Sequence, residues 1–133
     1  MSAVFDSTEA VPIAKNEARE VVQTLPLVPH KPAIYVVPDD AVGVQLGCEL
    51  APLPLDREMQ LVAFAYDSLD DGATWQLVTG LMYAGTGSKL RPNGQPHSDP
   101  QSSAHMRAGK GRLLKVVYAS FLPISTSLAV RIF

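Results

Sequence analysis

Histidine, cysteine and serine are residue types that often act in catalysis or bind metals, and in this chain few of them have the spacing that either role requires. His30 lies between prolines, while His97 and His105 lie eight residues apart in a polar stretch, a spacing that fixes no metal geometry. No Gly-x-Ser-x-Gly or cysteine-protease pattern sets a nucleophile beside a histidine and a carboxylate. Cys48 falls on the apolar positions of an alternating segment, as a small core residue does. We therefore expect no catalytic residues, no metal site and no cofactor.

Carboxylates gather in one short segment of the chain. Asp67, Asp70 and Asp71 offer the hard oxygen ligands that Ca²⁺ prefers. Calcium loops that can be read from sequence are longer and end in a bidentate acid, so the spacing favours a solvated turn over a calcium site.

The segment 68–75, SLDDGATW, resembles the Asp box, a Ser-x-Asp-x-Gly-x-Thr-Trp turn found in sialidase-type propeller blades and in unrelated β proteins. The matching residues are Ser68, Asp70, Gly72, Thr74 and Trp75. At this spacing the aspartate can accept hydrogen bonds from turn amides, the glycine can adopt a positive φ, and the tryptophan can close over the hairpin. The resemblance implies a structural hairpin turn, since 133 residues are too few for several propeller blades.

Residues 85–111 form a long glycine- and proline-rich segment with almost no apolar content. It lacks the Gly-Lys-Ser/Thr ending of a phosphate-binding loop. Long segments of this kind are usually functional or disordered. A solubilising loop is one reading, and an interaction surface is the other. The candidate interface residues are the bases in and beside this segment, namely Lys89, Arg91, Arg107, Lys110 and Arg112.

Charge is balanced overall and divided along the chain. The net charge of -2 supplies no field to hold a polyanion, so nucleic acid is not expected as the main partner. Residues 1–58 carry nine acids and four bases, and residues 59–133 carry four acids and seven bases. This division arises by chance or serves self-association, in which the basic segment meets acids of a neighbouring copy such as Glu9, Glu17, Glu20, Asp39 or Asp40.

The carboxyl-terminal two thirds of the chain has the pattern of β-strands. Residues 42–48 alternate between apolar and polar. Residues 60–66 have apolar side chains on both faces of the expected strand, and residues 74–83 follow the turn to complete a hairpin. Residues 112–121 and 125–133 predict a second pair of strands, in the last of which Leu128, Val130 and Ile132 share one face. The pattern predicts an all-β fold, an antiparallel β-sandwich or small jelly roll over residues 41–133.

The first 40 residues differ from the rest and predict an extended N-terminal arm. Residues 14–25 have the apolar spacing of a short helix, and residues 26–38 contain four prolines that disfavour central pairing in a sheet. The first 20 residues contain acids and no apolar run, so they indicate neither a secretory signal nor a membrane anchor. We expect synthesis in the cytoplasm and no membrane partner.

Together these features predict a non-enzymatic structural or assembly protein that self-associates through its arm and loop. Small β-sandwiches with extended arms look like capsid, decoration or tail proteins of viruses and bacteriophages, a likeness of general architecture only. The alternative is a carbohydrate-binding or adhesion module. Against it stands the low aromatic content of 7%.

Overall fold

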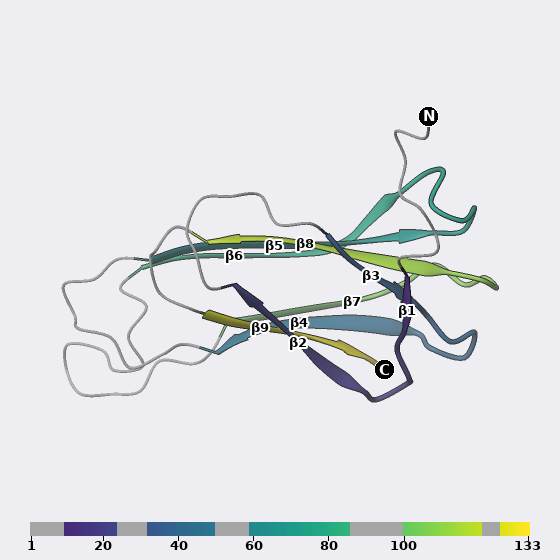
Figure 1. Cartoon of the computed structure of the whole chain (residues 1–133), viewed down its shortest axis with the longest axis horizontal. Coiled ribbons are helices and arrows are strands. Elements are labelled where there is room, and N and C mark those ends of the chain that lie inside the picture. The colour runs from purple at the N-terminus through teal and green to yellow at the C-terminus, as the bar shows by residue number, and fades with distance from the viewer. Residues whose placement is uncertain (1–9, 24–31, 50–58, 86–99, 121–125) are drawn as a thin grey trace.

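The chain folds into two stacked β-sheets, described by a computed structural model for residues 10–23, 32–49, 59–85, 100–120 and 126–133. Figure 1 shows the two layers nearly edge-on. The five-stranded sheet has the order β1-β3-β8-β5-β6, and the four-stranded sheet has the order β2-β9-β4-β7. No helix occurs in the described residues. The predicted all-β, antiparallel β-sandwich is confirmed.

The strand bounds follow the chain in order. They are β1 (Val11–Pro12), β2 (Ala18–Gln23), β3 (Ala33–Val36), β4 (Gly43–Glu49), β5 (Met59–Ser68), β6 (Gln76–Gly85), β7 (Gln101–His105), β8 (Leu113–Ser120) and β9 (Thr126–Ile132). Every strand pairing is antiparallel except the short parallel pair of β1 with β3.

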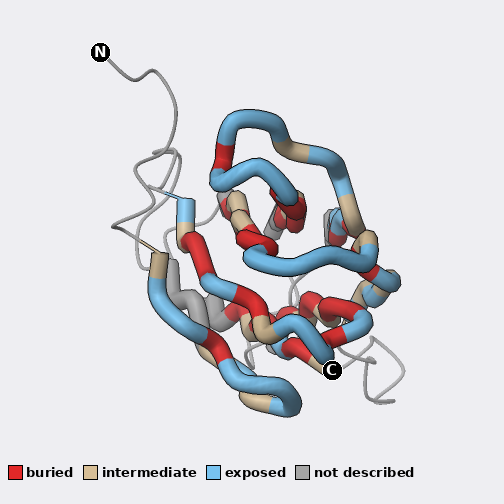
Figure 2. The backbone as a smooth tube through the Cα atoms, turned by 90° about the vertical axis from the view of Figure 1, so that its right-hand side faces the viewer, coloured by how far each residue is buried: buried red, intermediate tan, exposed pale blue. Residues whose placement is uncertain are grey.

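The core lies between the sheets, where alternate residues of each strand meet. Figure 2 shows buried and exposed segments alternating along the tube. Successive side chains of a strand point to opposite faces, so each strand contributes every second residue to the interior. The four-stranded sheet contributes the fully buried residues Val44, Leu46, Cys48, Leu128, Val130 and Ile132, and β8 contributes Leu114, Val116 and Tyr118.

The predicted pairing of residues 112–121 with residues 125–133 is wrong. Strand β8 lies in the five-stranded sheet between β3 and β5, whereas β9 lies in the four-stranded sheet between β2 and β4. The chain therefore crosses from one layer to the other between these strands. Alternation in the sequence identifies a strand and its buried face, but it carries no information about which neighbour the strand takes.

The predicted arm over residues 1–40 also needs correction, because three of its segments are strands. Strand β3 is hydrogen-bonded on both sides, and its Ile34 and Tyr35 are buried. Pro32 and Pro38 flank β3 without entering it, so the prolines bound the strand and do not prevent its pairing. Ile13 is also buried against the core. Residues 1–9 and 24–31 lie outside the described part of the chain.

The short helix predicted at residues 14–25 is a turn followed by strand β2. Asn16 has a left-handed φ of 66°, and its amide donates to the carbonyl of Ile132. From Ala18 onward the chain pairs with β9. A segment this short forms a helix only marginally by itself, and pairing with an existing sheet supplies more hydrogen bonds and burial.

The polar segment at residues 85–111 is not wholly a loop. Residues 101–105 form β7, which pairs with β4, and Met106 is buried in the core. The polar side chains of β7 suit its place at the edge of the four-stranded sheet. Residues 86–99 lie outside the described part.

Candidate functional site

The Asp-box turn joins β5 to β6. Asp70 accepts hydrogen bonds from the Thr74 amide at 2.9 Å and the Thr74 hydroxyl at 2.6 Å. The Ser68 hydroxyl donates to the same carboxylate at 2.8 Å and accepts from the Gly72 amide at 2.8 Å. Gly72 has a φ of 88°, a conformation that side chains with a Cβ rarely adopt. The motif residues thus hold one another and leave Asp70 little capacity for a ligand.

The electrostatics of the turn follow from these bonds. The hydroxyl and amide of Thr74, with the Ser68 hydroxyl, lower the pKa of Asp70 from an ordinary value of 3.8 to about 2. Its carboxylate is therefore ionised at neutral pH. Within the described residues no group of three or more His, Cys, Asp or Glu side chains is placed to hold a metal ion.

Arg112 was expected at an interface, but it is a buried structural residue, 1% exposed. Its guanidinium donates to four backbone carbonyls, those of Arg107, Pro38, Asp39 and Ala41. It thereby ties the turn after β3 to the segment before β8. The positive charge that suggested a surface partner instead meets the chain's own carbonyl dipoles.

The other candidate interface residues divide into three cases. Arg107 forms an ion pair with the buried Asp67 at 2.6 Å, and its backbone amide donates to the same carboxylate. Lys110 is exposed, whereas Lys89 and Arg91 lie outside the described residues. Asp67, read from sequence as part of an acidic turn, is thus an internal partner that links β5 to the chain beyond β7.

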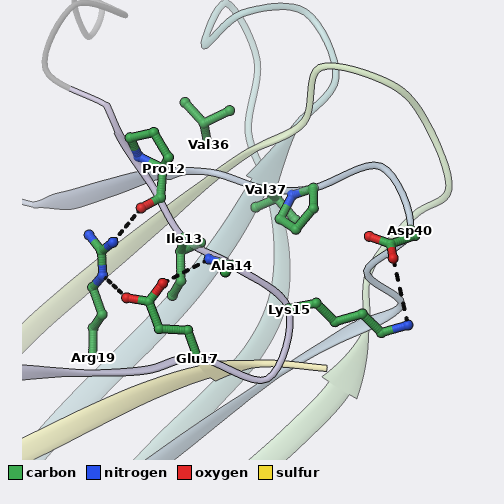
Figure 3. Close-up of a pocket in the computed structure, with 10 residues that line it drawn as sticks. Pro12, Ile13, Ala14, Lys15, Glu17, Arg19, Val36, Val37 and Asp40 are labelled. Atoms are coloured by element: carbon green, nitrogen blue, oxygen red, sulfur yellow. Dashed lines mark hydrogen bonds and ion pairs between the residues drawn. The ribbon is translucent and has the colours of Figure 1, made fainter.

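Some acids that were expected to meet a neighbouring copy have partners within the chain. An open hollow of about 500 Å³ lies between β1, the turn after it and the end of β3. Figure 3 shows the side chains that line it. Arg19 donates a hydrogen bond to the Glu17 carboxylate and another to the Pro12 carbonyl at 2.5 Å. The Lys15 ammonium lies 3.9 Å from the Asp40 carboxylate. The bond from Arg19 lowers the pKa of the Glu17 carboxyl. These four charged side chains line the hollow and pair with each other.

The outer face of the five-stranded sheet is apolar, a feature that the sequence analysis missed. In β5 the small residues Ala63 and Ala65 point inward and are 0% exposed. The larger Val62, Phe64 and Tyr66 alternate with them and therefore point outward, each only partly buried. Antiparallel sheets usually reserve the outer face for polar residues. In β5, by contrast, the large apolar side chains lie on the outer face and the small ones lie in the core.

Neighbouring strands extend this surface, which we call the outer face. Val62 lies opposite Met82, Tyr66 lies opposite Leu77, and Phe64 lies opposite Val117. Met82 and Leu77 are 74% and 54% exposed. The residues of the outer face are Val62, Phe64, Tyr66, Leu77, Met82, Lys115 and Val117. A signal for it was present in the sequence, because large and small apolar residues alternate over residues 62–66.

Aromatic rings and one cation occupy the end of the outer face nearest the Asp-box turn. The Lys115 ammonium lies 4.5 Å from the centre of the Trp75 ring and 5.3 Å from that of Tyr66. The Tyr66 and Phe64 ring centres are 6.5 Å apart. Burial lowers the pKa of Lys115. The Lys115 ammonium is attracted to the faces of both rings, so Lys115, Tyr66 and Trp75 form one contiguous cluster.

The histidine and the cysteine among the described residues lie apart from one another. His105 is exposed and packs edge-on against Phe133, whereas His30 and His97 lie outside the described part. Cys48 is buried in the core. None of the described elements is a helix of the length and apolar character needed to cross a membrane.

Comparison with known proteins gives no further guide. No model of a known protein family matches the chain, and no curated protein matches it.

Proposed function

We propose that this chain is a non-enzymatic structural subunit that works by self-association, as the capsid, decoration or tail subunits of a virion do. The observation that carries the proposal is the outer face. Its large apolar side chains lie outside the sandwich while alanines of the same strand lie inside. Such an arrangement is favourable when another surface covers the outer face.

The contiguity of the outer face is the physical argument for a partner. Single exposed apolar residues are normal on protein surfaces, but contiguous apolar patches usually mark interaction sites. Here the residues are linked by strand pairing across β6, β5 and β8, and Lys115 is the only charged side chain among them. Burial of this area on association contributes roughly 25 cal/mol for each Å² of apolar surface removed from water.

The virion setting rests on general architecture. A small two-sheet sandwich with one apolar outer face suits repeated packing of identical subunits, because each copy presents the same surface. The structure changes one part of the earlier expectation. Strands β1 to β3 belong to the fold, and Arg107 and Arg112 bond within the chain, so we now place the proposed contact on the outer face. Lys89 and Arg91 of the basic loop lie outside the described residues.

Light scattering after size-exclusion chromatography tests the proposal. We expect the wild-type chain to form an oligomer whose fraction rises with protein concentration. Val117→Lys and Val62→Lys place a charge on the outer face and should shift the chain toward monomer. Val42→Lys is the matched control, since Val42 is an exposed valine outside this face. A monomeric wild type, or equal effects of all three variants, would contradict the proposal.

Carbohydrate binding remains the second candidate, and one observation favours it. Phe64, Tyr66 and Trp75 gather at one end of the outer face, and aromatic rings stack on the apolar faces of sugars. Trp75 is the only tryptophan, so its fluorescence should report a sugar that binds there. Saturable quenching by an oligosaccharide, lost in Tyr66→Ala, from a chain that stays monomeric would favour this candidate over assembly.

A further inference from the structure

The two sheets expose four edge strands within the described residues, and three of these are protected against pairing with another chain. Strand β1 has only two residues and ends in Pro12. Strand β2 carries Arg19 and Glu20, and β7 has only five residues, four of them polar. Short length, proline, charge and polarity are the devices by which proteins protect an edge.

Strand β6 is the fourth edge and lacks most of these devices. It has ten residues, contains neither charge nor proline, and pairs only with β5 among the described strands. One irregularity interrupts it, where Ala65 pairs with Thr79 and Tyr66 with Leu77, so that Val78 is the extra residue of a bulge. Beyond the bulge, residues 79–85 pair regularly with β5, and on their other side they carry a row of backbone donors and acceptors that no described strand pairs with.

We propose that β6 pairs with β6 of a second copy, antiparallel and about a twofold axis through Met82. The inference rests on the proposed function in one respect, since it adds a second contact, at the edge of the five-stranded sheet, to the one proposed on the outer face. Met82 lies at the middle of the regular stretch and is the most exposed of the large apolar residues. The bulge at Val78 limits the pairing at one end.

Two properties of β6 make a second copy the occupant. First, the strand carries no charge, so two copies approach without electrostatic repulsion. Second, an edge strand running antiparallel to an identical strand satisfies the free donors and acceptors of both copies in the same pattern. In an antiparallel pair, opposed residues either both point their backbone donors and acceptors at the partner or both point them away. In a twofold pair of identical strands, one residue must therefore lie opposite its own copy.

The pairing extends the outer face across two molecules. Directly opposed residues in an antiparallel pair have Cβ atoms about 4.5–5.5 Å apart and point to the same face of the sheet. The two Met82 side chains would therefore touch, and Val62, which lies opposite Met82 within each copy, would be the next contact outward. The five-stranded sheets would become one continuous sheet with a single apolar face.

A charge exchange at Met82 tests the inference. Met82→Lys and Met82→Glu each place two like charges opposite each other in the symmetric pair, and each variant alone should associate at least about tenfold more weakly than wild type. An equimolar mixture of the two places lysine opposite glutamate and should restore association, measured by light scattering and native mass spectrometry. The side chain is largely exposed, so both variants should keep the circular dichroism of the wild type.

Val42→Lys and Val42→Glu are the matched controls, because Val42 is about half exposed and lies outside both β6 and the outer face. They should associate like the wild type, alone and mixed. A second readout is specific to edge pairing: hydrogen exchange should protect the amides of residues 79–85 at every residue in the oligomer and at alternate residues in the monomer.

The outcomes separate the two proposals. If wild type self-associates and the Val117→Lys variant dissociates, but Met82→Lys and Met82→Glu behave like wild type, the β6 inference is overturned and the proposed function stands. Weak association of both Met82 variants without recovery on mixing also overturns the twofold pairing. A wild type that stays monomeric overturns both.

Discussion

Replacement of Arg112 by methionine should lower the free energy of unfolding by about 3–5 kcal/mol. Methionine replaces the aliphatic stem of arginine, but it ends short of the guanidinium nitrogens and donates no hydrogen bond. The variant therefore keeps most of the packing and leaves four carbonyl groups, from Arg107, Pro38, Asp39 and Ala41, without the guanidinium donor.

The magnitude follows from the burial of each bond. The Ala41 carbonyl is the buried acceptor, at 2.7 Å, and an orphaned buried acceptor costs about 1–3 kcal/mol. The bonds to the other three carbonyls, at 3.0, 2.9 and 3.1 Å, are only partly buried. Water replaces the guanidinium there, so each loss costs roughly 0.5–1 kcal/mol.

Urea denaturation followed by Trp75 fluorescence measures this free energy. Arg131→Met is the control, because Arg131 is exposed and the same substitution should there cost less than about 0.5 kcal/mol. Arg112→Lys should fall between the two, since an ammonium keeps the charge but reaches fewer of the four carbonyls from one point. If Arg112→Met loses no more than Arg131→Met, the guanidinium does not hold the turn after β3.

Three further outcomes are expected. Gly72→Val should destabilise the chain by roughly 1–3 kcal/mol, seen as a lower melting temperature, because valine is strained at a φ of 88°. Asp70 should titrate near pH 2 by carboxyl NMR, and Thr74→Val should raise this midpoint. Because the pKa of Asp70 is lower in the folded chain, its ionised carboxylate stabilises the fold fully above the ordinary pKa of 3.8, and this stabilisation is lost as the pH falls through about 2. Deletion of residues 1–38 should abolish folding by circular dichroism because it removes β1, β2 and β3, whereas deletion of residues 1–9 should preserve it.

Local patterns in the sequence predicted strands β4, β5, β6, β8 and β9, and they predicted the buried face where apolar and polar residues alternate. In β9 the alternation of Leu128, Val130 and Ile132 indicated one apolar face, and all three residues are fully buried. A strand partner was predictable where a short turn joins the two strands, as in the β5–β6 hairpin, but not for β8 and β9, which lie in different sheets. Strand β3 was missed because its flanking prolines indicated an arm, although all four residues of β3 pair with β8.

The candidate site was less accessible from the sequence, for two physical reasons. Arg112 and Arg107 have the charge of surface residues, and only the folded chain brings the carbonyls of the turn after β3 and the carboxylate of Asp67 to them. For the outer face, residues 62–66 reveal two apolar faces but not their orientation. The larger side chains would ordinarily be assigned to the interior, which is the reverse of what the structure has.

The pairing of β2 with β9 has a consequence for the order of folding. Ala18, near one end of the sequence, pairs with Arg131, near the other, so the four-stranded sheet closes only after a long loop has been ordered. The β5–β6 hairpin is local and its turn is held by its own hydrogen bonds, so it can form much earlier. Chains rich in distant pairings fold slowly, on a scale of about milliseconds to seconds. During that interval the uncharged edge of β6 is already present while the rest of the sandwich is not, and crowding of nascent chains would then favour aggregation over folding.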